Sequence, residues 1–527
     1  MKKYILPILL FCGGCFSSCV DDEGNYDYTH LDDYSISGLE SAYSVLAYID
    51  SIKIEPVVEN TIEGKPVDEN NLEYEWHICY SVEIDANNSI SHNHVPISTE
   101  KNLDWLVDVA PGSYRLYFVV RDKATQLESH TYTDILVKES LGRGFMVLGD
   151  VDGSPELGLD MLVMAPNRDT VYVENVFDNS ELQLTGAEDI VFTGLLRDAT
   201  KANIWLMTHD QTYKLDLKDF HMIGTFQQQN IIDNEYDFRM PMLCKGVYPT
   251  QLNAPYGGQS ERLRYYVTEE AVFGGSIMSY EVFNEPLNRY SATSKEFFKF
   301  YPKVFAYVSA YSPNMMAYAF LYDMDADKIV VTNSNFSPTC CADVREYNLN
   351  PWSCDFASQN RTLVYGEPGT TNSNASFYMI VKDKTNPEYF IYRAILSSAY
   401  GAYPTSKYLH NVDLGVATDF DKASFYAFPS YNTRMVYAAG NKLYQYDYGR
   451  NAVSSMEFDG EITYLHVDKA SAGRTQDVIV ATWNDSTKGK IYKLSIDTNP
   501  NTMEFTTYDA QVWSTRLKVK KVEWKNS

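Results

Sequence analysis

One hydrophobic pattern recurs through residues 140–527: a hydrophobic strand, a short polar turn, then a tyrosine that opens another strand. The intervals between successive tyrosines are 41, 67, 67, 45, 52 and 48 residues, and a four-stranded propeller blade needs about 45. The seven tyrosines are Tyr172, Tyr213, Tyr280, Tyr347, Tyr392, Tyr444 and Tyr492. This pattern predicts a β-propeller over 140–527, with seven blades favoured over eight.

The final strand pattern, Leu517–Trp524 (LKVKKVEW), predicts how the ring closes. We expect it to pair with the first blade near Phe145, because closure removes open sheet edges. The two long intervals indicate insertions near 220–260, 284–303 and 333–345. Long loops on a rigid scaffold often carry function, although they can equally be neutral variation.

Residues 36–139 show short alternating strands separated by turns. Asn71–Trp76 reads as a strand with Tyr74 and Trp76 on one face. Pro111 and Gly112 make a turn, and the alternating stretch that follows breaks at Arg121 and Asp122. About 100 residues with this spacing predict an Ig-like β-sandwich.

The first 18 residues have the order of an export signal. Lys2 and Lys3 precede a short apolar stretch, and Ser17 and Ser18 precede Cys19. Small residues just before a cysteine are typical of a bacterial lipoprotein signal, so Cys19 is the predicted lipid attachment site and Cys15 the alternative. We therefore expect a signal peptide at 1–18 and an acidic tether at 19–35. No other run of 18 apolar residues follows, so the lipid would be the anchor.

Several stretches resemble a known family. YEW at Tyr74–Trp76, APGSYRLYFVVRD at Ala110–Asp122 and TYTDILVKES at Thr131–Ser140 look like a PKD domain, an Ig-like sandwich. Together with CVDDEGNYDY at Cys19–Tyr28 and GRGFMVLGD at Gly142–Asp150, they resemble the PKD-like lipoprotein family of Bacteroidetes. This chain has Phe145 where that family usually shows tryptophan.

The resemblance implies a location and a partner. Asp21, Asp22 and Glu23 resemble the acidic tag that sends Bacteroidetes lipoproteins to the outer cell surface. Family members are typically encoded near SusC/SusD-type importers, which implies such a transporter complex as the partner of this protein. The outer membrane, facing the cell exterior, is the expected location.

Charge narrows the classes of ligand. Lys and Arg number 44 and Asp and Glu 70, a formal net charge of −26. This balance excludes nucleic-acid binding by phosphate neutralisation and argues against docking of the protein surface on anionic lipids. It favours a cationic or neutral cargo over an acidic polysaccharide.

Catalytic and metal motifs find little support in the sequence. The triplet Asp323, Asp325 and Asp327 lacks the glycine and glutamate of a calcium loop, since Lys328 and Ser334 occupy those positions, and reads as a hairpin turn. No GxSxG, HExxH or phosphate-loop motif occurs, and no metal or cofactor is predicted. Cys354 could form a disulfide with Cys340 or Cys341, or all could be free thiols.

Aromatic side chains are the remaining candidates for binding. Trp352, in the loop NPWSCD, is the best candidate for an exposed ligand-binding ring, followed by Tyr248, Tyr256 and Tyr311 in proline-flanked loops. Four other tryptophans are predicted to pack in the interior: Trp76, Trp105, Trp205 and Trp483.

Together these observations predict a non-enzymatic accessory lipoprotein that captures peptide or glycan or docks on the transporter. A propeller hydrolase or lyase is the first alternative, and would require acids or histidines converging at the mouth of the channel. A structural or adhesive surface protein is the second.

Overall fold

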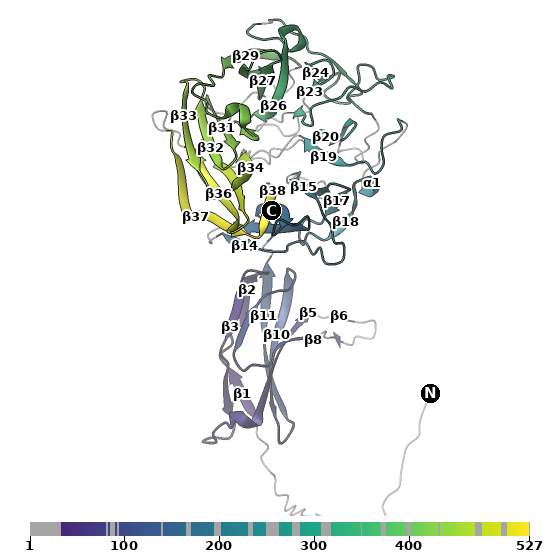
Figure 1. Cartoon of the computed structure of the whole chain (residues 1–527). Helices are drawn as coiled ribbons and strands as arrows, with labels where there is room; N and C mark the ends of the chain where they lie inside the picture. Colours follow the sequence, from purple (N-terminus) through teal and green to yellow (C-terminus); the bar gives the residue numbers. More distant parts are fainter. Residues whose placement is uncertain are drawn as a thin grey trace, which may run out of the picture. The chain divides into compact units, whose positions relative to one another are not determined.

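A computed structural model describes most of the chain after residue 32 (Figure 1). The described residues are 33–80, 83–84, 90–91, 94–138, 141–164, 170–193, 202–229, 236–248, 263–276, 285–306, 318–348, 350–369, 376–396, 402–429, 433–468, 477–496 and 503–525. Within these ranges the chain is built from strands, and its helices are α1 (Phe226–Gln229), η1 (Glu69–Asn71), η3 (Ala357–Gln359) and η4 (Phe420–Lys422). None of these helices has the length and apolar character to cross a membrane. The predicted all-β class is confirmed.

The N-terminal domain is a β-sandwich with a five-stranded antiparallel sheet in the order β2-β11-β10-β5-β8, beside the pairs β1-β4, β3-β9 and β6-β7. Its strands are β1 (Tyr34–Ser37), β2 (Ala42–Leu46), β3 (Ser51–Ile54), β4 (Val57–Asn60), β5 (Leu72–Tyr80), β6 (Glu83–Ile84), β7 (Ile90–Ser91), β8 (His94–Ser98), β9 (Leu103–Leu106), β10 (Gly112–Asp122) and β11 (Glu128–Lys138). Alternate residues of β10 face the core. There the rings of Phe118 and the fully buried Trp76 pack with their centroids 4.4 Å apart. The period of two read from the sequence therefore sets which side chains are buried.

The predicted break at Asp122 marks a turn held by that side chain. Asp122 Oδ1 accepts the backbone N–H groups of Ala124 and Thr125, and Oδ2 accepts the Tyr34 hydroxyl. These bonds favour the charged carboxylate, led by the Thr125 N–H, and lower the pKa of Asp122 despite its burial. A single buried aspartate thus joins the β10-β11 turn to the first strand.

Seven sheets of three or four strands surround a central axis in the C-terminal domain, which is a seven-bladed β-propeller (Figure 1). Blade 1 contains β38 (Leu517–Lys525), β12 (Gly144–Val151), β13 (Leu157–Val163) and β14 (Val171–Val173); blade 2 contains β15 (Ala187–Phe192), β16 (Ile204–Thr208), β17 (Thr212–Leu215) and β18 (Met222–Thr225); blade 3 contains β19 (Cys244–Tyr248), β20 (Leu263–Thr268) and β21 (Val272–Ser276); and blade 4 contains β22 (Phe305–Ala306), β23 (Ala319–Asp323), β24 (Lys328–Thr332) and β25 (Cys341–Asp343). Blade 5 contains β26 (Arg361–Gly369), β27 (Ser376–Asp383), β28 (Tyr389–Leu396) and β29 (Pro404–Asn411); blade 6 contains β30 (Phe425–Ala427), β31 (Arg434–Ala439), β32 (Lys442–Asp447) and β33 (Ala452–Glu457); and blade 7 contains β34 (Glu461–Asp468), β35 (Asp477–Asn484), β36 (Lys488–Ile496) and β37 (Phe505–Thr515).

The last strand closes the ring as predicted. β38 pairs with β12 along its length, and Trp524 lies opposite Phe145 in the register. Their rings pack edge to face with centroids 4.9 Å apart. Blade 1 is therefore assembled from both ends of the propeller sequence, with the C-terminal strand innermost.

The tyrosine pattern gives the right blade number but the wrong strand in some blades. Tyr213, Tyr392, Tyr444 and Tyr492 lie in the third strand of blades 2, 5, 6 and 7. Tyr172 instead lies in the fourth strand of blade 1, Tyr347 lies outside the strands, and Tyr280 lies outside the described residues. Tyrosine abundance made unrelated positions look like members of one repeat.

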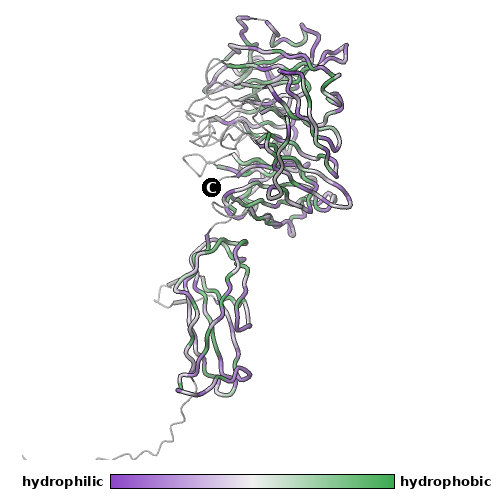
Figure 2. The backbone as a smooth tube through the Cα atoms, turned by 90° about the vertical axis from the view of Figure 1, so that its left-hand side faces the viewer, coloured by the Kyte–Doolittle hydropathy of each residue, from purple (hydrophilic) through white to green (hydrophobic). Residues whose placement is uncertain are grey.

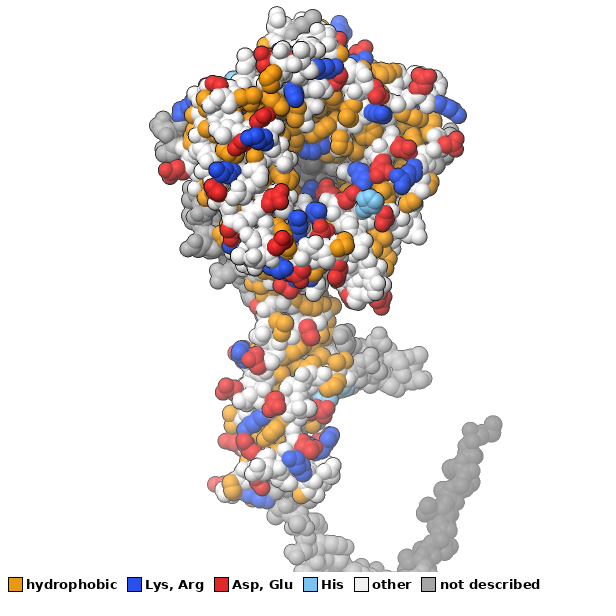
Figure 3. All heavy atoms as spheres, viewed as in Figure 1, with side chains coloured by type: hydrophobic (Ala, Val, Ile, Leu, Met, Phe, Trp, Pro, Cys, Tyr) orange, Lys and Arg blue, Asp and Glu red, His pale blue; other side chains and the backbone are white. Residues whose placement is uncertain are grey.

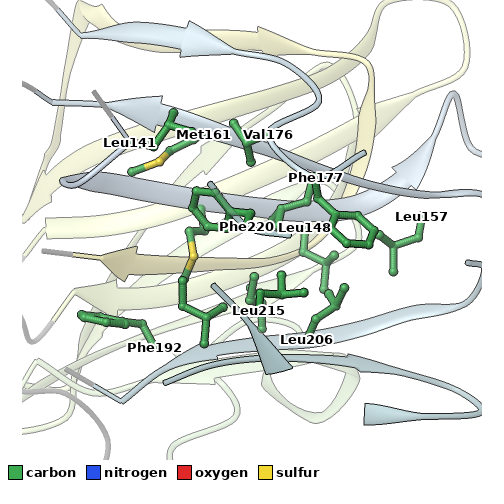
Figure 4. Packing of buried hydrophobic residues seen from close by; sticks show 14 of the residues in the cluster. Leu141, Leu148, Leu157, Met161, Val176, Phe177, Phe192, Leu206, Leu215 and Phe220 are labelled. Carbon is green, nitrogen blue, oxygen red and sulfur yellow. The ribbon is translucent and has the colours of Figure 1, made fainter. Parts of the chain in front are cut away.

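Apolar clusters between neighbouring blades hold the ring together. Between blades 1 and 2, Leu148 and Met161 from one sheet pack with Phe192, Leu206 and Leu215 from the other (Figure 4). Fully burying a leucine-sized side chain contributes about 1.5–3 kcal/mol. Hydrophobic and hydrophilic residues follow one another at short intervals along the backbone trace (Figure 2).

Candidate functional site

Five of the innermost blade strands carry one extra residue relative to the strand beside them. The extra residue forms a β-bulge, and the strands that carry one are β38, β15, β19, β26 and β34. The bulged residues are Lys520, Glu188, Lys245, Val364 and Thr463. A bulge re-aims the side chains that follow it, and bulges are frequent beside functional sites.

A cavity of about 190 Å³ lies where these inner strands converge. Its walls come from β12, β15, β19, β26, β34, β35 and β38, and from Lys303 at the end of the 284–303 insertion. Asp189, Gly246, Tyr365 and Lys521 each follow a bulge directly and line it. Figure 3 shows a hollow at the centre of this face of the ring.

Lys521 lies between two acids at the cavity wall. Its Nζ is 2.9 Å from Asp189 Oδ1 and 3.7 Å from Glu523 Oε2. Burial alone would lower the pKa of Lys521, but the charges of Asp189 and Glu523 outweigh it and raise that pKa well above its ordinary value. Lys521 is therefore a permanent cation that joins blade 1 to blade 2.

A second polar group comes from blade 5. Tyr365 donates its hydroxyl to Glu367 Oε2 at 2.8 Å, and the Phe428 N–H donates to Glu367 Oε1 at 2.6 Å. Lys303 Nζ lies 4.3 Å from the centroid of the Tyr365 ring, in range for a cation–π contact. Burial, then Glu367, raises the pKa of Tyr365 well above its ordinary value, so this phenol remains a neutral donor.

Tyr248, one of the predicted binding aromatics, lines this cavity. Its ring is buried, and burial raises the pKa of its hydroxyl, so it too remains neutral. A Cβ at Gly246 would lie 2.9 Å from the Tyr248 ring, so the glycine leaves the room that the ring needs. Burial also raises the pKa of the neighbouring Tyr301 to about 12, and its hydroxyl accepts the Gly366 N–H at 3.3 Å.

Trp352 is not exposed, contrary to the prediction. Its side chain is 1% exposed, its ring stacks on Tyr392 with centroids 4.8 Å apart, and its Nε1 donates to the Tyr408 carbonyl at 3.0 Å. The NPWSCD loop folds back on blade 5, so the ring completes an apolar cluster. Local sequence could not show this, because the packing partners lie 40 and 56 residues further along the chain. The other four tryptophans predicted to pack are buried: Trp76, Trp105, Trp205 and Trp483.

The five cysteines among the described residues are free thiols, so neither predicted pairing of Cys354 is formed. Cys354 packs in the cluster that contains Trp352, whereas Cys341 packs in a different cluster beside Tyr265, and Cys340 is buried next to it. A spacing of 13 or 14 residues permitted pairing, but the chain between them leads to separate interblade clusters. Burial raises the pKa of another of the thiols, Cys244, to about 12, which keeps it unreactive.

The other predicted site residues lie outside the described residues: Cys15, Cys19, Asp21, Asp22, Glu23, Tyr256 and Tyr311. Their roles remain predictions.

Sequence reasoning missed most of the cavity wall. One signal was present in LKVKKVEW, where Lys520 and Lys521 interrupt the alternation between Val519 and Val522. Two consecutive lysines in an otherwise alternating strand indicate a bulge, and the structure has one there. The sequence around Asp189 and Glu367 had no comparable irregularity. These residues line one cavity only because the folded ring turns blades 2 and 5 toward the same axis.

Two acidic turns have different settings. Asp323, Asp325 and Asp327 lie at the β23-β24 hairpin, as predicted. The half-buried Asp216 and the exposed Asp219 and His221 have ligand atoms within 4.8 Å of one another, a geometry that could hold a metal ion. His221 Nδ1 donates a hydrogen bond to Asp219 Oδ1 at 2.6 Å, which raises the pKa of the histidine and already accounts for the contact.

The sequence model of the PKD-like family matches residues 19–181. The N-terminal domain is PKD-like. The match covers the tether, the sandwich and the strands β12, β13 and β14 of blade 1, but not β38 or the rest of the propeller. No curated protein matches this chain.

Solved structures with similar folds include three with low identity. A quinonprotein alcohol dehydrogenase-like protein from Bacteroides thetaiotaomicron is 11% identical, with a TM-score of 0.37, over 94% of this chain and 97% of that one. The extracellular domain of a putative one component system from the same organism is 10% identical, with a TM-score of 0.34, over 88% and 66%. An apocarotenoid oxygenase mutant from Synechocystis is 7% identical, with a TM-score of 0.38, over 74% and 94%. These likenesses carry no information about the activity of this chain.

Proposed function

We propose that this protein is a surface lipoprotein that captures a small polar cargo in its propeller cavity beside a SusC/SusD-type importer. The observation that carries the proposal is the central cavity, built by bulged inner strands that aim aromatic, acidic and basic side chains at one space. The PKD-like match and the predicted Cys19 anchor support the location.

The cavity is arranged for binding. Each of its three carboxylates has donors: Asp189 and Glu523 face Lys521, and Glu367 accepts a phenol and a backbone N–H. These contacts fix the orientation of the side chains before any ligand arrives, which reduces the entropy lost on binding. The lipid anchor would hold the cavity near the importer and raise the local concentration of captured cargo.

A pull-down from native outer membranes tests the partnership. Because Trp524 lines the cavity, the affinity tag belongs away from the C-terminus, for example in the exposed β27-β28 turn at Asn386. Recovery of a SusC/SusD-type pair in near-stoichiometric amounts, with a co-purified small molecule, is expected. Recovery of the lipoprotein alone would contradict the stable complex, and recovery of a host or matrix protein would favour an adhesive role.

Paired cysteine variants test the anchor. Cys19→Ala is expected to abolish incorporation of radiolabelled palmitate and to move the protein out of the membrane fraction. Cys15→Ala is the matched control and should retain both. If the two variants exchange these behaviours, Cys15 is the attachment site. Replacing Asp21, Asp22 and Glu23 together with alanine should keep the protein on the inner side of the outer membrane, so that protease added to intact cells no longer digests it.

A polysaccharide hydrolase or lyase remains the second candidate, because the required convergence of acids and a histidine is present. Asp189, Glu367, Glu523 and His466 reach one cavity from four blades. Incubation of glycans with the wild-type protein and with Glu367→Gln distinguishes the candidates. Turnover that the substitution abolishes would support the enzyme, whereas binding without turnover supports capture.

A further inference from the structure

We infer that the propeller cavity recognises a single neutral sugar ring, the terminal unit of a glycan cargo. The inference rests on the proposed function and names the class of ligand. It follows from the density of polar groups, the state of the tyrosines, the size of the cavity and its charge.

Both donors and acceptors of hydrogen bonds line the cavity. Lys303 and Lys521 are donors, Asp189 and Glu523 are acceptors, and the Tyr248 hydroxyl can be either. A ligand that meets this wall must offer many groups able both to donate and to accept within a small volume. Sugar hydroxyls do so, whereas a peptide has one backbone donor and one acceptor per residue and needs an extended groove.

The tyrosines favour an uncharged ligand. Burial raises the pKa of Tyr248 and of Tyr365, so both stay phenols across the physiological range. Their hydroxyls bind by hydrogen bonding, and their rings, with Phe145 and Trp524, give the wall an apolar part. Such a mixed surface matches a sugar, which has C–H faces and a rim of hydroxyls.

The size of the cavity suits one ring. A cavity of roughly 150 Å³ holds a benzene molecule, so about 190 Å³ accommodates one six-membered ring and its substituents but no polymer chain. The rest of a glycan would therefore extend out of the mouth.

The charges oppose an acidic sugar. Three carboxylates and two lysines line the space, and Lys521 already lies between Asp189 and Glu523. A uronic acid would bring a fourth carboxylate into this small space, where it would meet three like charges and only two lysines.

The test measures binding by the full-length lipoprotein in detergent with calorimetry. The probes are glucose, galactose, mannose, N-acetylglucosamine and maltotriose, each neutral; glucuronate and galacturonate; and tri-alanine and tri-lysine. At least one neutral sugar is expected to bind, and its uronate counterpart about tenfold or more weakly, since losing one hydrogen bond or gaining one repulsion is worth about that factor.

Two cavity variants and one control locate the site. Tyr365→Phe and Glu523→Gln should each weaken sugar binding about tenfold, because the first removes a hydroxyl and the second replaces a charged acceptor with a weaker neutral one. Tyr347→Phe, in a ring that is 64% exposed and outside the cavity, should leave affinity unchanged. Near-native far-UV circular dichroism of the variants shows that they fold.

The outcomes separate the inference from the proposed function. Binding of a peptide that Tyr365→Phe weakens would overturn the sugar assignment and retain capture in the cavity. Tighter binding of a uronate than of its neutral counterpart would also overturn it. Binding of no probe, with no small molecule in the membrane pull-down, would overturn both, and sugar binding unaffected by either cavity variant would place the site elsewhere.

Discussion

Two charged networks attach the closing strand β38 to its neighbours, and they are built from similar groups. Just before the strand, Arg516 lies beside the fully buried Asp160, with a guanidinium nitrogen 3.1 Å from Oδ1. Within the strand, Lys521 lies beside Asp189 and Glu523. We call the first the enclosed network, because the Asp160 side chain has no exposed surface, whereas Asp189 in the second, the cavity network, is 30% exposed and borders the central cavity.

The polar groups of the enclosed network bond to one another across the junction that closes the ring. Asp160 also accepts the Tyr172 hydroxyl at 2.6 Å and the Asn175 N–H at 2.8 Å, and Tyr172 contacts Thr515 in the neighbouring blade. Burial, then Asp160, raises the pKa of Tyr172, so it remains a donor. The cavity network also joins two blades, but water or a ligand can reach it. The two networks therefore have similar chemistry and differ in the solvent access of their acids: Asp160 is fully buried and Asp189 is 30% exposed.

The largest expected effect is at the enclosed network. Asp160→Ala leaves Arg516, Tyr172 and the Asn175 N–H without their shared acceptor. The free energy of unfolding should fall by about 3–5 kcal/mol, the usual loss when one member of a buried pair is removed. Urea denaturation followed by tryptophan fluorescence measures this. Asp210→Ala, at an 84% exposed side chain, is the control and should change stability by less than about 0.5 kcal/mol. Equal losses would show that Asp160 does not lock the ring.

A smaller loss is expected at the cavity network. Lys521→Met leaves Asp189 and Glu523 facing each other, and should lower stability by about 1–3 kcal/mol, because solvent in the cavity screens their repulsion. Urea denaturation measures the loss. Lys520→Met is the control: its side chain is 41% exposed and pairs with Asp150, so it should change stability by less than about 1 kcal/mol. Equal losses in the two variants would contradict the account.

The middle of the strand should depend on a single hydrogen bond. Tyr464 of blade 7 donates its buried hydroxyl to the Val522 carbonyl at 2.9 Å. Tyr464→Phe removes that bond without changing the shape of the ring, so about 1 kcal/mol of stability should be lost. The shift of the urea midpoint measures it. A loss as large as that of Asp160→Ala would mean that the closing strand is held mainly at its middle.

The smallest effect is expected at the exposed pair of Asp219 and His221. The hydrogen bond that His221 donates to Asp219 raises the pKa of the histidine above 6.5. The stabilisation that this bond gives the fold is therefore complete below pH 6.5 and is lost as the pH rises through the pKa of His221 in the folded protein. Asp219→Asn should return the histidine pKa toward 6.5 in an NMR titration, with little change in the unfolding midpoint. An unchanged titration would show that the contact does not persist in solution.

The sequence predicted elements whose evidence is local. The alternation in LKVKKVEW predicted a strand, and the need to cover sheet edges predicted its partner near Phe145, which the structure confirms. Tyr248 was predicted to lie in a proline-flanked loop, but it is the last residue of β19 and its ring is 8% exposed, so its binding role stays a prediction. Trp352 had the same kind of signal and is buried, since the loop around it has an apolar cluster to join.

The sequence by itself determined the all-β class, the order of sandwich and propeller, and the closing strand, because periods of two and blade-sized spacing are written along the chain. Only the tertiary structure decided which charges meet. Lys303, Glu367, Asp189 and Lys521 come from blades far apart in sequence, and closing the ring brings them to one axis. Bulges then turn Asp189 and Lys521 inward, and a bulge depends on the pairing of two strands, which neither strand specifies alone.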